Sequence, residues 1–184
     1  MGTLVGAIGY RQLRDHSAPF AMLDRLEAEN LGADTAVEDV SYNPVALMQW
    51  LHGDAKGQFE RAIFIAAVER AGRPPGRVDA YRWDGILPPP ELIQQAVADA
   101  VTGIISLDNT LVVAGYFKAL PRQVAVVEIE PLEHAFGTDL SPEVTAAVET
   151  AVDLVRLLAT NPVAFDALPR AGIPEAAFYR AHAH

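Results

Sequence analysis

The most informative segment of this chain is the apolar run AIFIAAV at residues 62–68. A half-buried strand alternates apolar and polar residues, whereas a strand covered on both faces is apolar throughout. The run is also far too short to cross a bilayer as a helix. It therefore predicts the central strand of a mostly parallel or mixed sheet with helices on both of its faces.

The segments on either side of this run repeat a pattern of strands and helices. Further strands are expected at residues 3–8, 34–40, 77–83 and 124–130, and helices at residues 17–29, 43–51, 91–101, 109–119 and 141–158. Two of the helix starts are well marked, because Asn43-Pro44 and Ser141-Pro142 each pair a capping residue with proline in the first turn. Such alternation predicts an α/β fold in three layers, α/β/α.

The chain is expected to form one domain. Residues 1–160 contain the α/β pattern, and residues 161–184 form a Pro- and Ala-rich C-terminal extension that belongs to the same domain or is partly disordered. His182 and His184 are expected to lie in a frayed end, since terminal residues are poorly held.

Composition excludes several classes of function. The 184 residues include no cysteine, so disulfides, thiolate metal sites and a cysteine nucleophile are ruled out. The formal net charge of −10 argues against nucleic acid and anionic membranes as partners. The N-terminus has no basic flank followed by an apolar signal segment, so the protein is expected in the cytoplasm.

Chemically useful side chains fall at the expected strand-to-helix junctions. Asp15 and His16 follow the first strand, Asp39 ends the second, and Asp108 precedes a helix. Taken singly, each acid reads as a helix cap or a solvated loop residue. Taken together they should meet at one edge of the sheet, beyond the carboxyl ends of its strands. Imidazole and carboxylates there would suit a divalent metal such as nickel or zinc.

In order and spacing, these features resemble the hydrogenase maturation proteases. Members of that family begin with a strand, a G-[IV]-G-N turn, a leucine and an acidic pair that opens a helix. The corresponding segments cover about residues 3–158, at residues 7–16, Asp39, residues 63–76, residues 105–108, residues 126–131 and residues 140–142.

The resemblance implies a five-stranded twisted sheet between helices. It also implies an endopeptidase that removes the C-terminal extension of a [NiFe]-hydrogenase large-subunit precursor. In the family, recognition depends on nickel already inserted into the precursor. The nickel is bound through an acid of the first loop, an aspartate after the third strand and a histidine further on.

This chain departs from the family at each of these positions. His16 stands at the first-loop acid, Ala66 at the aspartate and Asp108 at the histidine, while Tyr10 replaces the family's asparagine. His16 and Asp108 thus look like an exchange of imidazole and carboxylate. Glu69, three residues beyond Ala66, is a candidate for the third ligand.

Three functions remain open at this stage. The first is a working endopeptidase, with Asp15, His16 and Asp39 as candidate catalytic residues and His16, Asp108 and Glu69 as candidate metal ligands. The second is a non-catalytic relative that binds a hydrogenase subunit during assembly, which Ala66 and Tyr10 favour. The third is an unrelated small-molecule hydrolase, and the chain offers no Gly-x-Ser-x-Gly elbow to support it.

Overall fold

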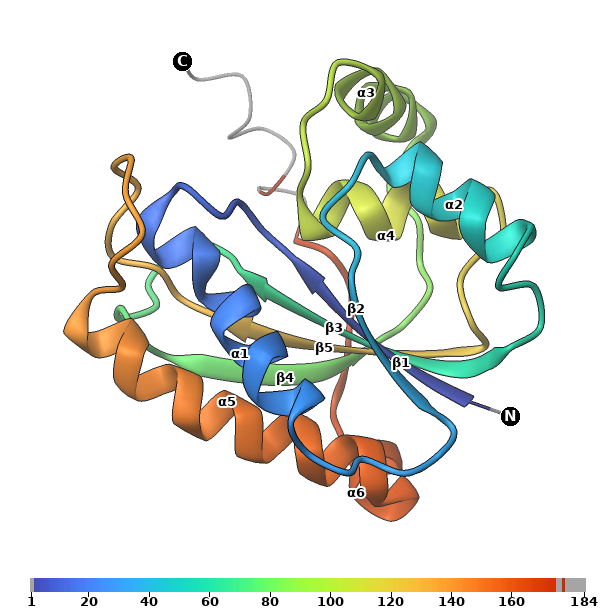
Figure 1. Cartoon of the computed structure of the whole chain (residues 1–184). Helices are drawn as coiled ribbons and strands as arrows, with labels where there is room; N and C mark the ends of the chain where they lie inside the picture. The colour runs from blue at the N-terminus through green and yellow to red at the C-terminus, as the bar shows by residue number, and fades with distance from the viewer. Residues whose placement is uncertain (1, 175–176, 178–184) are drawn as a thin grey trace.

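A computed structural model describes residues 2–174 and residue 177, so His182 and His184 lie outside the described residues. The strands are β1 (Gly2–Ile8), β2 (Thr35–Asp39), β3 (Phe59–Ala67), β4 (Val78–Trp83), β5 (Gln123–Ile129) and β6 (Arg170–Ala171). The helices are the 3₁₀ turn η1 (Arg14–Ser17), then α1 (Ala18–Glu27), α2 (Pro44–His52), α3 (Pro90–Val101), α4 (Leu107–Tyr116), α5 (Pro142–Thr160) and α6 (Pro162–Asp166). Figure 1 shows them as one sheet with helices on both faces.

The sheet is mostly parallel, as the sequence predicts. Its strand order is β2-β1-β3-β5-β4-β6. The strands β2, β1, β3 and β5 pair in parallel, β4 runs antiparallel to β5, and β6 pairs in parallel with β4. The sixth strand exceeds the five expected, because two residues of the C-terminal extension add to the edge of β4.

The central strand β3 is covered on both faces, which explains its unbroken apolar sequence. Ile63 and Ile65 pack into a core shared with α1 and α5, whereas Ala62 and Phe64 pack into a second core with α2 and α4. The helix α3 comes between β4 and α4 in the sequence, and it packs on the outside of α4. All four side chains are fully buried, so β3 fixes the two-sided architecture.

Helix starts agree in part with the expected caps. The side chains of Asn43 and Ser141 accept hydrogen bonds from backbone N–H groups of the first turn, as predicted. The prediction for α4 was wrong in detail: this helix begins at Leu107, and its N-cap is Ser106 rather than Asp108. Asp108 therefore lies in the first helical turn, where its carboxylate is free to bind another partner.

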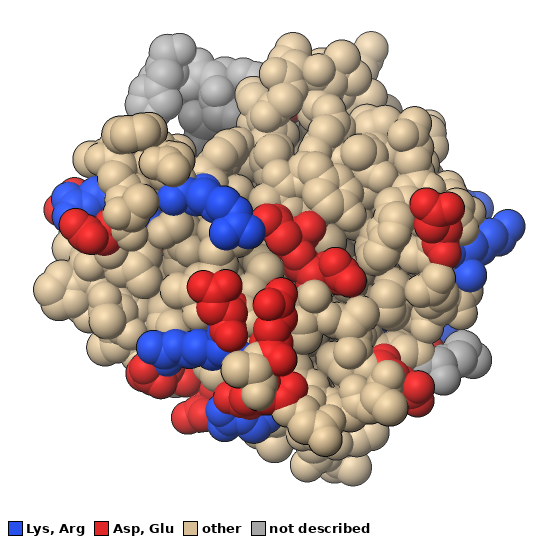
Figure 2. Space-filling view, in the orientation of Figure 1, with Lys and Arg blue, Asp and Glu red and all other residues tan. Residues whose placement is uncertain are grey.

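The C-terminal extension continues the fold beyond α5. Phe165 of α6 is fully buried in the core that α1 and α5 share, and Arg82 of β4 forms an ion pair with Asp166. On the face drawn in Figure 2, the described Lys and Arg side chains lie among acidic ones and form no broad basic area. Among the described residues, no helix combines the length and apolar character needed to span a membrane.

Candidate active site

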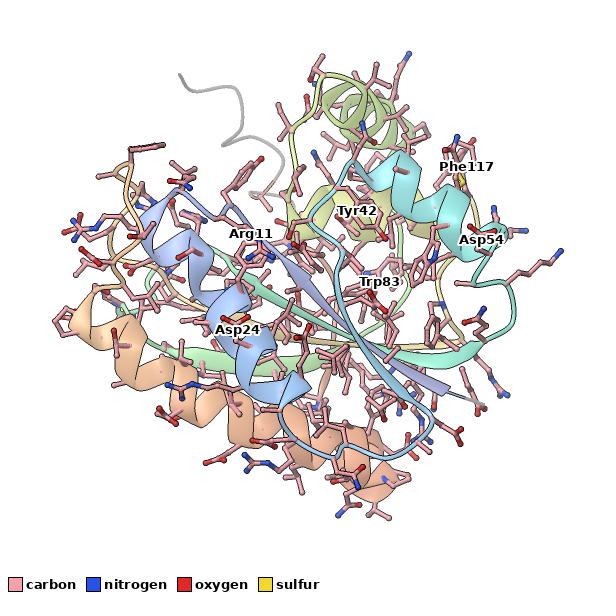
Figure 3. All side chains as sticks on the ribbon, viewed as in Figure 1. Arg11, Asp24, Tyr42, Asp54, Trp83 and Phe117 are labelled. Atoms are coloured by element: carbon pink, nitrogen blue, oxygen red, sulfur yellow. The ribbon has the colours of Figure 1, made fainter. Side chains whose placement is uncertain are left out.

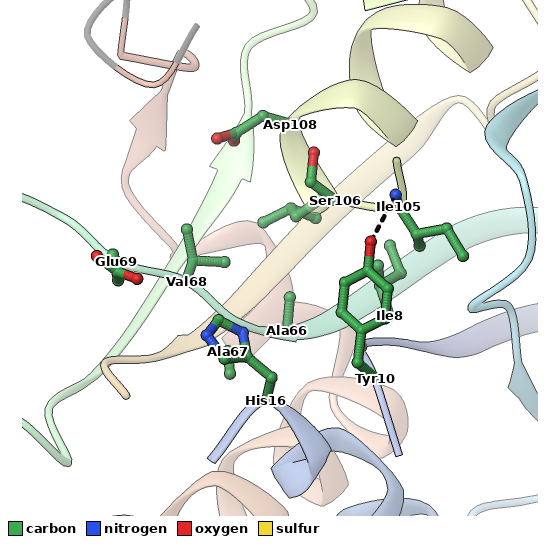
Figure 4. Close-up of a pocket in the computed structure, with 12 residues that line it drawn as sticks. Ile8, Tyr10, His16, Ala66, Ala67, Val68, Glu69, Ile105, Ser106 and Asp108 are labelled. Atoms are coloured by element: carbon green, nitrogen blue, oxygen red, sulfur yellow. Dashed lines mark hydrogen bonds between the residues drawn. The ribbon is translucent and has the colours of Figure 1, made fainter. Parts of the chain in front are cut away.

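A pocket lies beyond the carboxyl ends of β1 and β3, where ligands bind in open α/β sheets. Its volume is about 190 Å³. Three segments line it: the first loop with His16, the end of β3 with the residues after it, and the start of α4. Figure 4 shows His16 across the pocket from Ser106 and Asp108. The predicted crevice is therefore present, and it brings His16, Glu69 and Asp108 to its walls.

The first loop is tied to the start of α4 by Tyr10. Its hydroxyl oxygen accepts a hydrogen bond of 2.8 Å from the backbone N–H of Ile105, drawn as the dashed line in Figure 4. Gly9 is needed beside it, because a Cβ there would come within 2.4 Å of the His16 carbonyl oxygen. Tyr10, at the position of the family's asparagine, thus joins two walls of the pocket.

Asp15 points away from the pocket. It is fully buried, and its carboxylate accepts hydrogen bonds of 2.7–2.9 Å from the backbone N–H groups of Leu132, Glu133 and Ser141 and from the Ser141 hydroxyl. Burial raises the pKa of Asp15, but these four bonds outweigh it and hold the pKa below its ordinary value. Asp15 therefore anchors the loop between β5 and α5 to the first loop.

Asp39 lies at the end of β2 and is also outside the pocket wall. Its carboxylate forms a 2.7 Å ion pair with Arg11 and accepts a 2.9 Å hydrogen bond from the backbone N–H of Ser41. Figure 3 labels Arg11, whose guanidinium also stacks over the Phe20 ring at 4.1 Å. Burial raises the pKa of Asp39, yet Ser41 and Arg11 lower it more. The structure does not bring Asp39 together with His16.

Asp108 lines the pocket, but a buried arginine occupies its carboxylate. Arg70 donates two hydrogen bonds of 2.8 and 2.9 Å to the two oxygens of Asp108. The same guanidinium forms a 2.7 Å ion pair with Glu128, a fully buried residue of β5. Glu128 also accepts hydrogen bonds from Arg73 and from the Tyr81 hydroxyl. Asp108 thus belongs to a buried ionic network.

The electrostatics of this network keep its charges in place. Burial raises the pKa of Glu128, but Arg70 and Arg73 outweigh it and hold the pKa below its usual value. Burial and the adjacent Glu128 carboxylate raise the pKa of the Tyr81 phenol. Tyr81 therefore remains a neutral hydrogen-bond donor, and Arg70 remains the cation that neutralises both acids.

His16 instead faces a residue that the sequence analysis did not select. Its Nε2 lies 3.0 Å from Nδ1 of His134, and that same Nδ1 lies 3.3 Å from a carboxylate oxygen of Glu69. One ligand atom from each of the three residues lies within 4.8 Å of the other two. Burial lowers the pKa of His16, and the neighbouring His134 lowers it further. A neutral imidazole of this kind can bind a metal.

Known structures of similar fold include several hydrogenase maturation proteases. A hydrogenase 2 maturation peptidase from a Thaumarchaeota archaeon aligns with 25% identity and a TM-score of 0.60, over 88% of this chain and 99% of its own. The hydrogenase maturating endopeptidase HybD from E. coli aligns at 22% identity, with a TM-score of 0.61 and 88% and 94% coverage. The [NiFe] hydrogenase maturation protease HybD from Thermococcus kodakarensis aligns at 20% identity with a TM-score of 0.60, over 86% of this chain and 99% of its own.

This chain is a structural relative of the hydrogenase maturation proteases. No family model matches its sequence, and no curated protein matches it. The likeness is therefore carried by the fold and by the order of short motifs that the sequence analysis recognised. It extends over nearly the whole length of the relatives.

The pocket of this chain lacks two of the three metal ligands expected from the hydrogenase maturation proteases. Ala66 lies in the pocket wall, where its methyl group offers no ligand atom. Asp108 is paired with Arg70 through both oxygens. Of the family's three positions, only that of His16 carries a ligand group that no arginine neutralises, and its Nε2 faces His134. Nickel recognition through all three positions does not fit this chain.

The residues that the sequence analysis missed lie on two segments. His134 follows β5, whose carboxyl end borders the same edge of the sheet as β1 and β3, but it lies five residues beyond the strand and no sequence motif marks it. Arg70 and Glu128 were missed because a buried arginine and a buried glutamate leave no local pattern. The one available signal was Glu128 itself, the only charged residue of the strand Gln123–Ile129 and one that interrupts its apolar run.

Proposed function

We propose that this protein is a maturation endopeptidase that removes the C-terminal extension of a [NiFe]-hydrogenase large-subunit precursor after nickel insertion, in the cytoplasm. The observation that carries this proposal is the pocket beyond β1 and β3, with His16 in its wall, on a fold shared with hydrogenase maturation peptidases. Nickel, in this proposal, belongs to the substrate and is not a resident cofactor.

The size of the pocket supports a protein substrate. Sites that enclose small molecules usually measure about 300–1,000 Å³, whereas this pocket measures about 190 Å³. It suits a side chain or a short backbone segment of a larger partner. The same comparison disfavours the small-molecule hydrolase reading.

The chain's own residues have separable tasks in this reaction. His16 lines the pocket at the family's first-loop position, so it would lie against the bound segment of the precursor. Tyr10 holds the first loop against the start of α4 and keeps the pocket walls together. Asp15 holds the loop that follows β5, and so positions it beside the pocket. The catalytic roles of Asp15 and Asp39 remain predictions.

A second function is favoured by a specific observation. Ala66 supplies no carboxylate and Arg70 neutralises Asp108, so a chain of this kind could bind a hydrogenase precursor without cutting it. A non-catalytic assembly factor would keep the fold and the pocket while losing the metal-dependent geometry of the cleavage step.

One experiment distinguishes the two functions. Each large-subunit precursor from the source organism is prepared with and without nickel, mixed with the purified protein, and analysed by intact mass spectrometry and size-exclusion chromatography. Loss of a C-terminal fragment from the nickel-loaded precursor alone supports the endopeptidase, and His16→Ala should abolish it. His52→Ala, at an exposed histidine of α2, is the matched control.

The remaining outcomes decide against one or both readings. A stable complex without any change of precursor mass would support the assembly factor and refute the endopeptidase. Neither complex nor cleavage, with every precursor of the organism, would refute both.

A further inference from the structure

Three loops that are distant in sequence bring metal-binding atoms to one point. His16 comes from η1 after β1, Glu69 follows β3, and His134 follows β5. Their closest ligand atoms are 3.0 Å apart for the two histidines and 3.3 Å apart for His134 and Glu69. The convergence is therefore a product of the parallel sheet, whose strands deliver these loops to the same edge.

We propose that His16, Glu69 and His134 form a divalent-metal site that belongs to this chain, with Zn²⁺ as the preferred ion. Two imidazoles and one carboxylate, with a fourth position left to water or substrate, form a ligand set that zinc enzymes use. This site differs from the set that the sequence analysis selected, because His134 takes the place of Asp108. It does not depend on the proposed function.

Two of the three distances between ligand atoms are close to those of a coordinated metal, and the third pair, from His16 and Glu69, lies within 4.8 Å. A tetrahedral metal with bonds of about 2.0–2.2 Å to nitrogen and oxygen places its ligand atoms roughly 3.3 Å apart. The spacing between His134 Nδ1 and the Glu69 oxygen already has this value, and the two histidine nitrogens need to separate only slightly. Glu69 and His134 are each about half exposed, so their side chains have room to adjust.

The hydrogen bonding among the three residues is incomplete without a cation. His134 Nδ1 lies against both His16 Nε2 and the Glu69 oxygen, and a ring nitrogen carries at most one proton to donate. Two lone pairs therefore compete for one donor. A divalent cation would accept a lone pair from each of the three atoms, which satisfies all of them at once.

The surroundings favour this set over the alternatives. Asp108 is held by the two terminal guanidinium nitrogens of Arg70 at 2.8 and 2.9 Å. Releasing it would leave this buried cation with Glu128 alone and its Nη1 without that acceptor. Ala66 has no ligand atom. His16 and Glu69 also line the pocket, so an ion bound between them would face it. The open coordination position would then be accessible to a bound substrate.

Calorimetric titration with ZnCl₂ tests the proposal without any precursor. The untagged chain carries His182→Ala and His184→Ala, which leaves three of its five histidines: His16, His52 and His134. We expect one Zn²⁺ per chain. His16→Ala and His134→Ala should each weaken binding at least about 100-fold, because removing a ligand costs more than the 10–100-fold effect of an outer partner. Glu69→Gln should weaken it at least about tenfold, and His52→Ala should leave it unchanged.

Two further measurements keep the result interpretable. Circular dichroism and thermal melting establish that each variant is folded, and Co²⁺ substitution gives the visible spectrum of a tetrahedral site only if the ligands surround the ion. Absence of Zn²⁺ binding, or affinity unchanged in His134→Ala, would overturn the proposal. So would loss of binding in folded Asp108→Asn, since that result would return the site to Asp108. Because cleavage is not measured, failure here is distinct from failure of the proposed function.

Discussion

Asp15→Asn should destabilise the fold strongly, although the substitution only replaces one carboxylate oxygen by an NH₂ group. The carboxylate is fully buried and accepts one hydrogen bond at Oδ1, from the Ser141 N–H, and three at Oδ2, from Leu132, Glu133 and the Ser141 hydroxyl. An asparagine can keep its carbonyl at the Oδ2 position. Its NH₂ group then faces the Ser141 N–H, so donor meets donor.

The size of the effect follows from these contacts. Three bonds lose their ionic character, at about 1 kcal/mol each, and one buried N–H is left without an acceptor, at roughly 1–3 kcal/mol. Relaxation of the loop recovers part of this, so we expect the free energy of unfolding to fall by about 3–5 kcal/mol. That is a large share of the roughly 5–15 kcal/mol typical of a domain.

The pH dependence has a defined sign. The folded-state pKa of Asp15 lies below its unfolded value, so its contribution is fully present above the unfolded pKa, near 3.9. The contribution is lost as the pH falls through the folded-state pKa. The difference between the wild type and Asp15→Asn should therefore be constant near neutrality and shrink in acid below about pH 4.

Urea denaturation at several pH values measures both quantities. The matched control is Asp39→Asn, because Asp39 and Arg11 form a partly exposed pair and such pairs contribute only about 0–1 kcal/mol. A midpoint for Asp15→Asn equal to that of the wild type would refute the reasoning. It would show that the buried carboxylate is not the anchor of the loop after β5.

Three further substitutions test other parts of the structure. Glu128→Gln should lower the free energy of unfolding by about 3–5 kcal/mol, measured by urea denaturation, because it leaves Arg70 and Arg73 partly unpaired. A urea midpoint equal to that of the wild type would contradict the buried network. Gly9→Ala should lower the free energy of unfolding by about 1–3 kcal/mol, since its Cβ would meet the His16 carbonyl oxygen. Scanning calorimetry measures this loss, and the comparison is Gly57→Ala, where the backbone is strained but no atom lies near the new Cβ. Tyr10→Phe should lower the free energy of unfolding by about 1–3 kcal/mol and speed hydrogen exchange of the Ile105 amide, because the amide loses its acceptor. An unchanged exchange rate at Ile105 would show that the Tyr10 hydroxyl is not that acceptor.

The pattern of apolar residues and helix caps predicted most of the fold. The run at residues 62–68 became the buried strand β3, and the caps at Asn43 and Ser141 begin helices where expected, since these signals depend on neighbouring residues. The edge strand β6 was missed because two residues of backbone pairing leave no hydropathy pattern. The start of α4 was misplaced because Ser106 and Asp108 are both good capping residues, and only the folded geometry selects Ser106.

The site was harder to predict because its chemistry depends on tertiary partners. His16, Glu69 and Asp108 do line one pocket, as the topology suggested. What the sequence did not reveal is how each side chain is used. Asp15 is bound by the loop that follows β5, and Asp108 is bound by Arg70. These partners lie 117 and 38 residues away, respectively, so no local motif could signal them.

The loss of one ligand and the gain of another trace to adjacent residues. Glu69 and Arg70 lie just beyond β3, after Val68, and they differ sharply in burial: the Glu69 side chain is 50% exposed, whereas that of Arg70 is 9% exposed. Arg70 turns inward and takes Asp108 into the buried network, while Glu69 remains at the surface beside His134. A single segment therefore removes the carboxylate of α4 from coordination and supplies another one close to His16. The altered family positions and the proposed histidine-rich site are, on this argument, two consequences of the same local structure.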